Sequence, residues 1–255
     1  MAIPQPPRAV TFDCWSTLIS DTNWEKTMLH RQHSLIEIAA KRGVEISAER
    51  SEQLIKDAWE QHVISWRNGG VFGAKGAADW ILGRLGIPPV SPGGESAEAE
   101  LAAELAHAIE SATSGVGTYV LDGAVDAINA VRDAGIATAL VCDVGFTPAR
   151  FVRGFLGDHG IKLDHYFFSD EVGTPKPFPP IFEAALEATG AAPGEAVHIG
   201  DLRRTDIAGA RQAGMGSIRY TGIHDDAWTP EEAHGEEADA VMNHWSELQG
   251  ILGLD

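Results

Sequence analysis

The hydrophobic pattern of this chain starts with a short run, Ala9–Phe12, in which every residue is apolar or β-branched. Such a run predicts a strand that is buried on both faces, as in a parallel sheet. Asp13 follows it directly, where a parallel strand opens toward a binding crevice. A single Asp in this place more often starts a turn or caps a helix, so its meaning depends on the rest of the chain.

The next hundred residues, from Asp21 to about Gly117, carry a different pattern. Apolar residues recur there at helical spacing, as at Trp24, Met28 and Leu35, and no run of strand quality interrupts them. Further helices are predicted over Leu54–Trp66, Ala77–Leu85 and Glu95–Ala112, with a loop of helix-breaking residues at Gly86–Gly94. We interpret this stretch as an inserted helical module whose tryptophans belong to its hydrophobic core.

From Tyr119 onward, helix and strand patterns alternate. The predicted strands are Ile136–Val141, Tyr166–Phe168, Ala196–Ile199, Ser217–Tyr220 and Ala240–Met242. The predicted helices are one capped by Asp122 and ending at Gly135, one opening near Thr147-Pro148, Pro179–Thr189 closed by Gly190, and Thr205–Ala213. This alternation indicates an α/β fold. Residues 1–19 and 118–255 are predicted to form a Rossmann-like domain with a doubly wound parallel sheet. Residues 20–117 are predicted to form an inserted α-helical domain.

Polar residues that can carry chemistry follow four of the predicted strands. Besides Asp13 they are Cys142-Asp143, Lys176, and the pair Asp201 and Asp206. These are suitable parts for phosphoryl transfer: Asp13 would attack phosphorus, Lys176 would neutralise negative charge, and Asp201 would help to hold Mg²⁺. The alternative for Asp201 and Asp206 is capping of the helix that starts near Thr205.

Composition narrows the choice of partners. A formal net charge of -18 and a pI near 4.8 argue against nucleic acid and against an anionic membrane surface. Residues 1–8 have no apolar core, so no signal peptide is expected, and no later run is long enough to span a bilayer. Two cysteines, Cys14 and Cys142, give no disulfide framework, so a reducing cytoplasm is expected.

Taken together, the motifs resemble those of the haloacid dehalogenase superfamily, in its order. They are Phe12-Asp13-x-x-x-Thr17-Leu18, the pair Lys176-Pro177, and Gly200-Asp201-x-x-x-x-Asp206 followed by Gly209-Ala210. The resemblance implies a mobile helical cap inserted after the first motif. It also implies that Asp13 is the nucleophile and a metal ligand, that the backbone carbonyl of Trp15 binds Mg²⁺, and that the Thr17 hydroxyl supports the loop. By the same resemblance, Lys176 is the family lysine, Asp201 is the acidic metal ligand, and Asp206 belongs to the metal site as the carboxylate that orients the lysine or the waters on the metal.

Two positions depart from the family pattern. Family phosphatases usually carry a second Asp, which protonates the leaving alkoxide, where this chain has Trp15. Loss of a general acid typically lowers the rate by about 10²- to 10⁴-fold, so leaving groups that are stable as anions are favoured. The second departure is Cys142-Asp143, where the family commonly has Ser or Thr followed by Asn. Asp143 either turns away from the site or, held protonated, acts as a substitute acid.

The sequence therefore predicts a Mg²⁺-dependent hydrolase, most simply a phosphatase for a small phosphorylated metabolite or an ester with a good leaving group. The first alternative is a metal-independent 2-haloacid dehalogenase, since those members of the family have an aromatic Tyr at the position of Trp15. Arg31 and Arg67 match their cap arginine by position only, and we expect both to be solvated. The second alternative is a catalytically weak binding or regulatory protein that has kept the fold.

Overall fold

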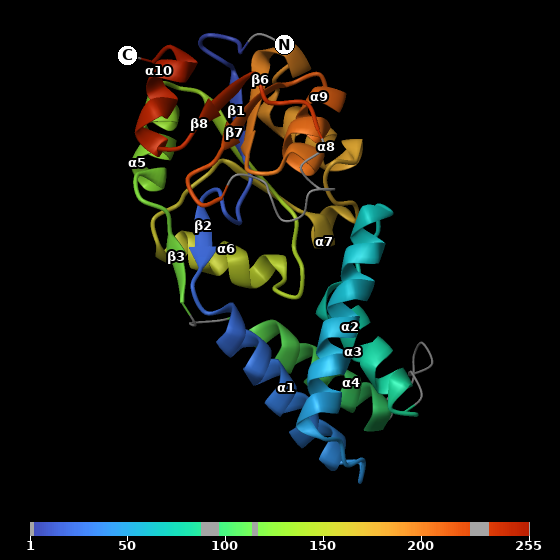
Figure 1. The fold of residues 1–255 in the computed structure, drawn as a ribbon. Coiled ribbons are helices and arrows are strands. Elements are labelled where there is room, and N and C mark those ends of the chain that lie inside the picture. The colour runs from blue at the N-terminus through green and yellow to red at the C-terminus, as the bar shows by residue number, and fades with distance from the viewer. Residues whose placement is uncertain (1–2, 88–96, 114–116, 225–234, 255) are drawn as a thin grey trace. The chain divides into compact units, whose positions relative to one another are not determined.

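The computed structural model describes residues 3–87, 97–113, 117–224 and 235–254, which fall into two compact units (Figure 1). The core unit consists of the described residues of Met1–Ser20, Tyr119–Asp143 and Arg153–Asp255. The helical unit consists of those of Asp21–Thr118 and Val144–Val152. The sequence did not indicate that the short segment Val144–Val152 groups with the helices.

The core unit is built on a parallel sheet of six strands, in the order β5-β4-β1-β6-β7-β8. The strands are β1 (Ala9–Phe12), β4 (Ala137–Cys142), β5 (His165–Phe168), β6 (Ala196–Gly200), β7 (Gly216–Tyr220) and β8 (Ala240–Met242). Strand β1 lies between β4 and β6, and Phe12 is in register with Leu140 and Ile199. The strand order reverses around β1, which is the topological switch point where α/β sheets bind ligands. The predicted α/β fold class is confirmed.

Helices of the core unit follow the strands as the alternating pattern predicts. They are α5 (Ala124–Asp133), α6 (Ala149–Asp158, which begins in the helical unit), α7 (Ser169–Val172), α8 (Pro179–Thr189), α9 (Ala208–Gln212) and α10 (Leu248–Leu252). Ile181, Phe182 and Ala185 of α8 are fully buried and pack in one cluster with Ala139 and Val141 of β4. This apolar packing of α8 against β4 stabilises the sheet, and the polar residues of the site follow the carboxyl ends of its strands.

Two helix starts differ from the prediction. Helix α5 is capped by Gly123, with φ 79°, and not by Asp122, because the chain enters this helix through a left-handed turn that favours glycine. The helix predicted from Thr205 begins as a π-helical turn, Arg203–Ile207, that continues into α9. π-Helical turns of this kind are frequent at functional sites, and this one carries Asp206.

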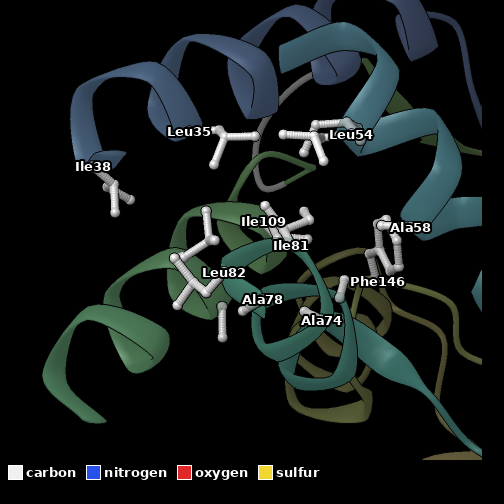
Figure 2. Close-up of a cluster of buried hydrophobic side chains, with 14 of the residues drawn as sticks. Leu35, Ile38, Leu54, Ala58, Ala74, Ala78, Ile81, Leu82, Ile109 and Phe146 are labelled. Atoms are coloured by element: carbon white, nitrogen blue, oxygen red, sulfur yellow. The ribbon is translucent and has the colours of Figure 1, made fainter. Parts of the chain in front are cut away.

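The helical unit contains α1 (Trp24–Ala40), α2 (Ala48–Arg67), α3 (Gly73–Arg84) and α4 (Ala97–Ser111). Leu35, Leu54 and Ile81 are fully buried in its hydrophobic cluster, and small residues such as Ala78 let the helices approach closely (Figure 2). The expectation that its tryptophans lie in the core is wrong for Trp24, which is 48% exposed. Helical spacing identifies a face but not how deeply each residue on it is buried.

Two short strands were not predicted, β2 (Ile19–Asp21) and β3 (Thr118–Val120), which pair with each other. Residues 88–94 of the predicted loop and residues 95–96 of the predicted helix lie outside the described part of the chain. Within the described part, no helix combines the length and the apolar character that crossing a membrane requires.

Candidate active site

The site forms at the carboxyl ends of three neighbouring strands of the core unit. Asp13 follows β1, Asp143 follows β4 and Asp201 follows β6. Because β1 is hydrogen-bonded to both β4 and β6, these ends lie at one edge of the sheet. Asp13 is fixed from the backbone, since its N–H donates to the carbonyl of Ile199 at 2.8 Å.

The turn after Asp13 is tight. The N–H groups of Leu18 and Ile19 both donate to the carbonyl of Cys14, at 2.8 and 3.0 Å. Ser16 has φ 59° and is the one described non-glycine residue with a positive φ, which is uncommon outside special turns and functional sites. Among the described residues, the backbone hydrogen bonds of this turn do not use the carbonyl of Trp15, the group that the resemblance assigns to the metal.

Lys176 joins two of the acidic groups. Its ammonium donates to Asp13 Oδ1 at 2.5 Å and to Asp206 Oδ1 at 2.7 Å, and its side chain is only 3% exposed. Burial alone would lower the pKa of Lys176, but the attraction of Asp13 and Asp206 outweighs burial and raises that pKa well above its usual value. The lysine is therefore a permanent cation that binds the expected nucleophile.

Two further groups hold this arrangement. The hydroxyl of Thr17 donates to Asp13 Oδ2 at 3.1 Å, so each oxygen of the Asp13 carboxylate has a donor. The backbone N–H of Lys176 donates to Asp143 Oδ1 at 2.9 Å. Asp143 thus fastens the lysine segment to the end of β4, and one of its oxygens is engaged there.

Asp206 is surrounded by donors. Oδ1 accepts from Lys176 and His198 Nε2, the latter at 3.1 Å, and Oδ2 accepts from the N–H of Leu202 at 3.0 Å and the hydroxyl of Thr205 at 3.2 Å. Burial favours protonation, but Lys176 and His198 outweigh it and hold the pKa of Asp206 well below its ordinary value. A carboxylate accepts about four hydrogen bonds, so these four donors occupy the acceptor positions of Asp206.

The pKa values of Asp13 and Asp201 are shifted in the opposite direction to that of Asp206. Burial, which is the largest effect, raises the pKa of Asp13 to about 6 and that of Asp201 well above its usual value. One carboxylate oxygen each from Asp13, Asp201 and Asp206 lie within 4.8 Å of one another. Three carboxylates face one lysine, so the site has excess negative charge that a hard divalent cation with oxygen ligands would balance.

The remaining predicted residues lie beside this cluster. The thiol of Cys142 is buried and donates to the backbone carbonyl of Asp143 at 3.3 Å, and burial raises its pKa well above the usual value, so it stays protonated. The side chain of Trp15 is partly exposed and offers no acid. Cys14 and Cys142 are both free thiols.

The sequence reasoning missed two histidines. His198 is fully buried within β6 and touches Asp206, while His224 Nε2 lies 3.4 Å from Asp201 Oδ2. A polar residue inside the run Ala196–Gly200 was the available signal for His198. No motif marks His224, which follows β7 along the chain.

Comparisons with known proteins agree with the motifs. The family model described as haloacid dehalogenase-like hydrolase matches residues 7–214. The chain is 30% identical over 208 residues to haloacid dehalogenase-like hydrolase domain-containing protein 3 of Homo sapiens, covering 77% of this chain and 78% of that protein. A shorter stretch of 60 residues is 45% identical to glyceraldehyde 3-phosphate phosphatase of Methanopyrus kandleri, covering 22% of this chain and 26% of that protein.

Solved structures show the same fold. A HAD phosphatase from Thermococcus onnurineus superposes with a TM-score of 0.61 at 23% identity, covering 97% of this chain and 99% of the other. A 2-haloacid dehalogenase from Pseudomonas syringae pv. Tomato superposes with a TM-score of 0.63 at 19% identity, covering 97% and 98%. Both kinds of enzyme share the fold, so the fold does not choose between their reactions. The family model spans most of the sequence, and the chain therefore belongs to the haloacid dehalogenase-like hydrolases.

Proposed function

We propose that this hydrolase is a Mg²⁺-dependent phosphatase that transfers the phosphoryl group of a small phosphorylated metabolite, or of an ester with a good leaving group, to Asp13. One observation supports this most strongly. A buried group of three carboxylates, Asp13, Asp201 and Asp206, is paired in the described part of the site with one permanently charged cation, Lys176. Metal-free dehalogenation gives no reason for such an excess of negative charge.

The donor set fits a hard cation. Asp13 and Asp201 would be direct ligands together with the carbonyl of Trp15, while Asp206, with its acceptor positions filled, would act through Lys176. Mg²⁺ prefers oxygen ligands and usually keeps several waters. When bound, it would neutralise charge on the phosphoryl oxygens and on the attacking carboxylate.

The protein residues then have defined tasks. A carboxylate oxygen of Asp13 forms a bond to phosphorus while the bond from phosphorus to the leaving oxygen breaks, and the leaving group takes the electron pair. Lys176 and Thr17 hold the Asp13 carboxylate in position for this attack. Water then hydrolyses the phosphorylated Asp13, which releases phosphate and restores the carboxylate.

The leaving group determines how well this site works. Trp15 cannot supply a proton, so aryl oxides, acyl groups and pyrophosphate should leave more readily than alkoxides. Asp143 is the candidate for a substitute acid, and one of its oxygens accepts from the N–H of Lys176. Asp143→Asn keeps an oxygen for that bond and removes the acid.

If Asp143 is the acid, Asp143→Asn lowers kcat for alkyl phosphates by about 10²-fold or more and leaves aryl phosphates much less affected. Initial rates with one alkyl and one aryl phosphate, measured at the same pH, test this. Equal losses with both substrates would reject the acid role and leave Asp143 as the anchor of the Lys176 segment.

Substrate selection is part of the proposal. We propose that the helical unit is the mobile cap that the resemblance implies, and that its closure excludes water from the site. The partial match to a glyceraldehyde 3-phosphate phosphatase supports a small phosphorylated substrate.

A hydrolysis panel tests the function. Acyl, aryl and alkyl phosphates are supplied beside 2-haloacids, each with Mg²⁺ and with a chelator. We expect phosphate release from the acyl and aryl compounds that the chelator abolishes. Halide release that is indifferent to the chelator would instead establish the dehalogenase, and binding of phosphorylated compounds without any turnover would establish the binding protein.

A further inference from the structure

His198 stands at the centre of β6, where the sequence pattern predicts only an apolar strand. Its side chain is fully buried, and it is in register with Thr11 on one side and Ser217 on the other. The ring of Phe182 meets it edge-on, with 5.1 Å between ring centroids. An imidazole enclosed in this way cannot change direction without disturbing the sheet.

Both ring nitrogens of His198 are hydrogen-bonded. Nδ1 lies 2.8 Å from the hydroxyl of Thr11, and Nε2 lies 3.1 Å from Asp206 Oδ1. An ionised carboxylate can only accept, so Nε2 carries the hydrogen that is donated to Asp206. In the neutral ring, Nδ1 then has no hydrogen and accepts from the hydroxyl of Thr11, which holds the ring in this orientation.

From this geometry we infer that His198, oriented by Thr11, is a positioning residue that sets the direction of Lys176 toward Asp13 by fixing Asp206 Oδ1. The inference rests on the proposed function and adds to it a residue that does not touch the substrate. Hydrogen bonds connect four side chains in sequence, namely Thr11, His198, Asp206 and Lys176.

Asp206 needs a rigid hydrogen-bond donor because its two carboxylate oxygens are held differently. Oδ2 is held by the N–H of Leu202, which precedes the π-helical turn as its N-cap, and by the hydroxyl of Thr205 within the turn that carries Asp206 itself. Oδ1 is held by His198 and by Lys176, and a lysine is a flexible chain with a rotating ammonium. Among the described residues, His198 is therefore the contact of Oδ1 that ties Asp206 to the sheet.

The orientation of Asp206 affects the expected nucleophile, Asp13, through Lys176. The ammonium of Lys176 is shared between Asp206 Oδ1 and Asp13 Oδ1, so a turn of the Asp206 carboxylate moves the cation relative to Asp13. Small displacements of a charge that acts in the transition state lower kcat more than they weaken substrate binding. If His198 only filled the core, its replacement would lower stability without lowering kcat more than it weakens substrate binding.

The test compares four variants. His198→Leu keeps the volume roughly and removes both hydrogen bonds, while His198→Gln can place an amide N–H near the position of Nε2. Thr11→Val removes the hydroxyl that is hydrogen-bonded to Nδ1 and leaves the bond from Nε2 to Asp206 in place. Ser217→Ala is the matched control, because Ser217 is equally buried, is the register neighbour of His198 and bonds Asp239 instead of the site.

For His198→Leu we expect kcat to fall about 10- to 100-fold, the range for losing a hydrogen bond to a charged group, with a much smaller change in KM. His198→Gln should recover most of this loss, and Thr11→Val should show a smaller loss. Ser217→Ala should lower the melting temperature without a comparable fall in kcat.

A second readout does not depend on turnover. In protein labelled with ¹⁵N-lysine, the buried ammonium of Lys176 should exchange its protons slowly and give a resolved signal. The signal should persist in His198→Gln and Ser217→Ala and shift or broaden in His198→Leu. A wild type that hydrolyses no phosphate would end the proposed function, while this signal would still decide the inference.

Two results would overturn the inference. One is a His198→Leu protein whose Lys176 signal and kcat match those of the wild type. The other is a loss of kcat that Ser217→Ala reproduces at equal loss of stability and that His198→Gln does not recover. Either would make His198 a residue of the core only.

Discussion

The two units of this chain bury their cations under different conditions. In the core unit, Lys176 lies between the carboxylates of Asp13 and Asp206, so its charge is compensated within the protein. In the helical unit, Arg31 is 2% exposed, and no carboxylate lies within ion-pair distance of it in the described part of the chain. Burial lowers the pKa of Arg31 to about 10, whereas the pKa of Lys176 is raised.

The hydrogen-bond partners of Arg31 are neutral, and the attraction of Asp21 offsets only part of the effect of burial on its pKa. Its guanidinium donates to the carbonyl of Ile109 at 3.0 Å and to Thr113 Oγ1 at 3.3 Å, and it lies over the ring of Phe146 with 5.1 Å to the centroid. Phe146 and Ile109 belong to the apolar cluster of the helical unit (Figure 2). We conclude that Arg31 joins α1 to the end of α4, while Lys176 balances the charge of Asp13 and Asp206 in the candidate active site.

The comparison is sharpest when each cation is replaced by methionine. Lys176→Met leaves two buried carboxylates without a cation, and we expect it to lower the free energy of unfolding by about 3–5 kcal/mol in the presence of a chelator. Arg31→Met leaves neutral acceptors without donors and should lower it by only about 1–2 kcal/mol. Urea unfolding measures both, and equal losses would contradict the distinction between the two sites.

Crowding at Asp206 gives a second test. A Cβ at Gly200 would overlap the carboxyl group of Asp206, whereas one at Gly154, in α6, would meet nothing within 4 Å. We expect Gly200→Ala to lower stability by about 1–3 kcal/mol, as overpacking does, and to impair hydrolysis. Gly154→Ala should instead raise stability by about 0.5–1 kcal/mol through helix propensity. Thermal unfolding of the pair would contradict this account if Gly200→Ala were neutral.

The smallest expected effect concerns metal and pH. The pKa of Asp13 is raised to about 6 in the folded protein, and that of Asp201 is raised well above its usual value. These carboxyls therefore stabilise the metal-free fold at acid pH, and this contribution is lost as the pH rises through their pKa values in the folded state. A bound cation requires both groups ionised, so added Mg²⁺ should stabilise the protein more at about pH 8 than at about pH 5.

The difference should be on the order of 1 kcal/mol, or about 2–4 °C in melting temperature for a chain of this size. Differential scanning fluorimetry with Mg²⁺ and with chelator at both pH values measures it, and Asp201→Asn should remove most of it. An equal gain at both pH values would show that Mg²⁺ binds elsewhere.

Local chemistry explains why much of the fold could be predicted. Helix α8 has the predicted bounds because Pro179 opens it and Gly190, at φ 64°, ends it. The π-helical turn at Arg203–Ile207 was not predictable, since it depends on the bonds that Asp206 makes to Leu202 and Thr205. The solvated role expected for Arg31 is wrong, because its burial results from packing between α1 and α4, which are far apart in the sequence.

The candidate site shows the same division. Asp13, Lys176, Asp201 and Asp206 could be named because they end strands or stand in motifs, and the structure places them together. Their catalytic roles remain predictions. His198 could not be named, since a polar residue inside a buried strand gains meaning only when the carboxylate eight positions later folds back onto it.

The central claim is that Asp13 becomes phosphorylated. The direct measurement is mass spectrometry of protein quenched in acid during turnover of an aryl or acyl phosphate with Mg²⁺. We predict one phosphoryl group on the peptide that contains Asp13, lost when a chelator is present and absent from Asp13→Asn. Steady phosphate release with no label on Asp13, or a metal-independent ester formed there from a 2-haloacid, would contradict the account.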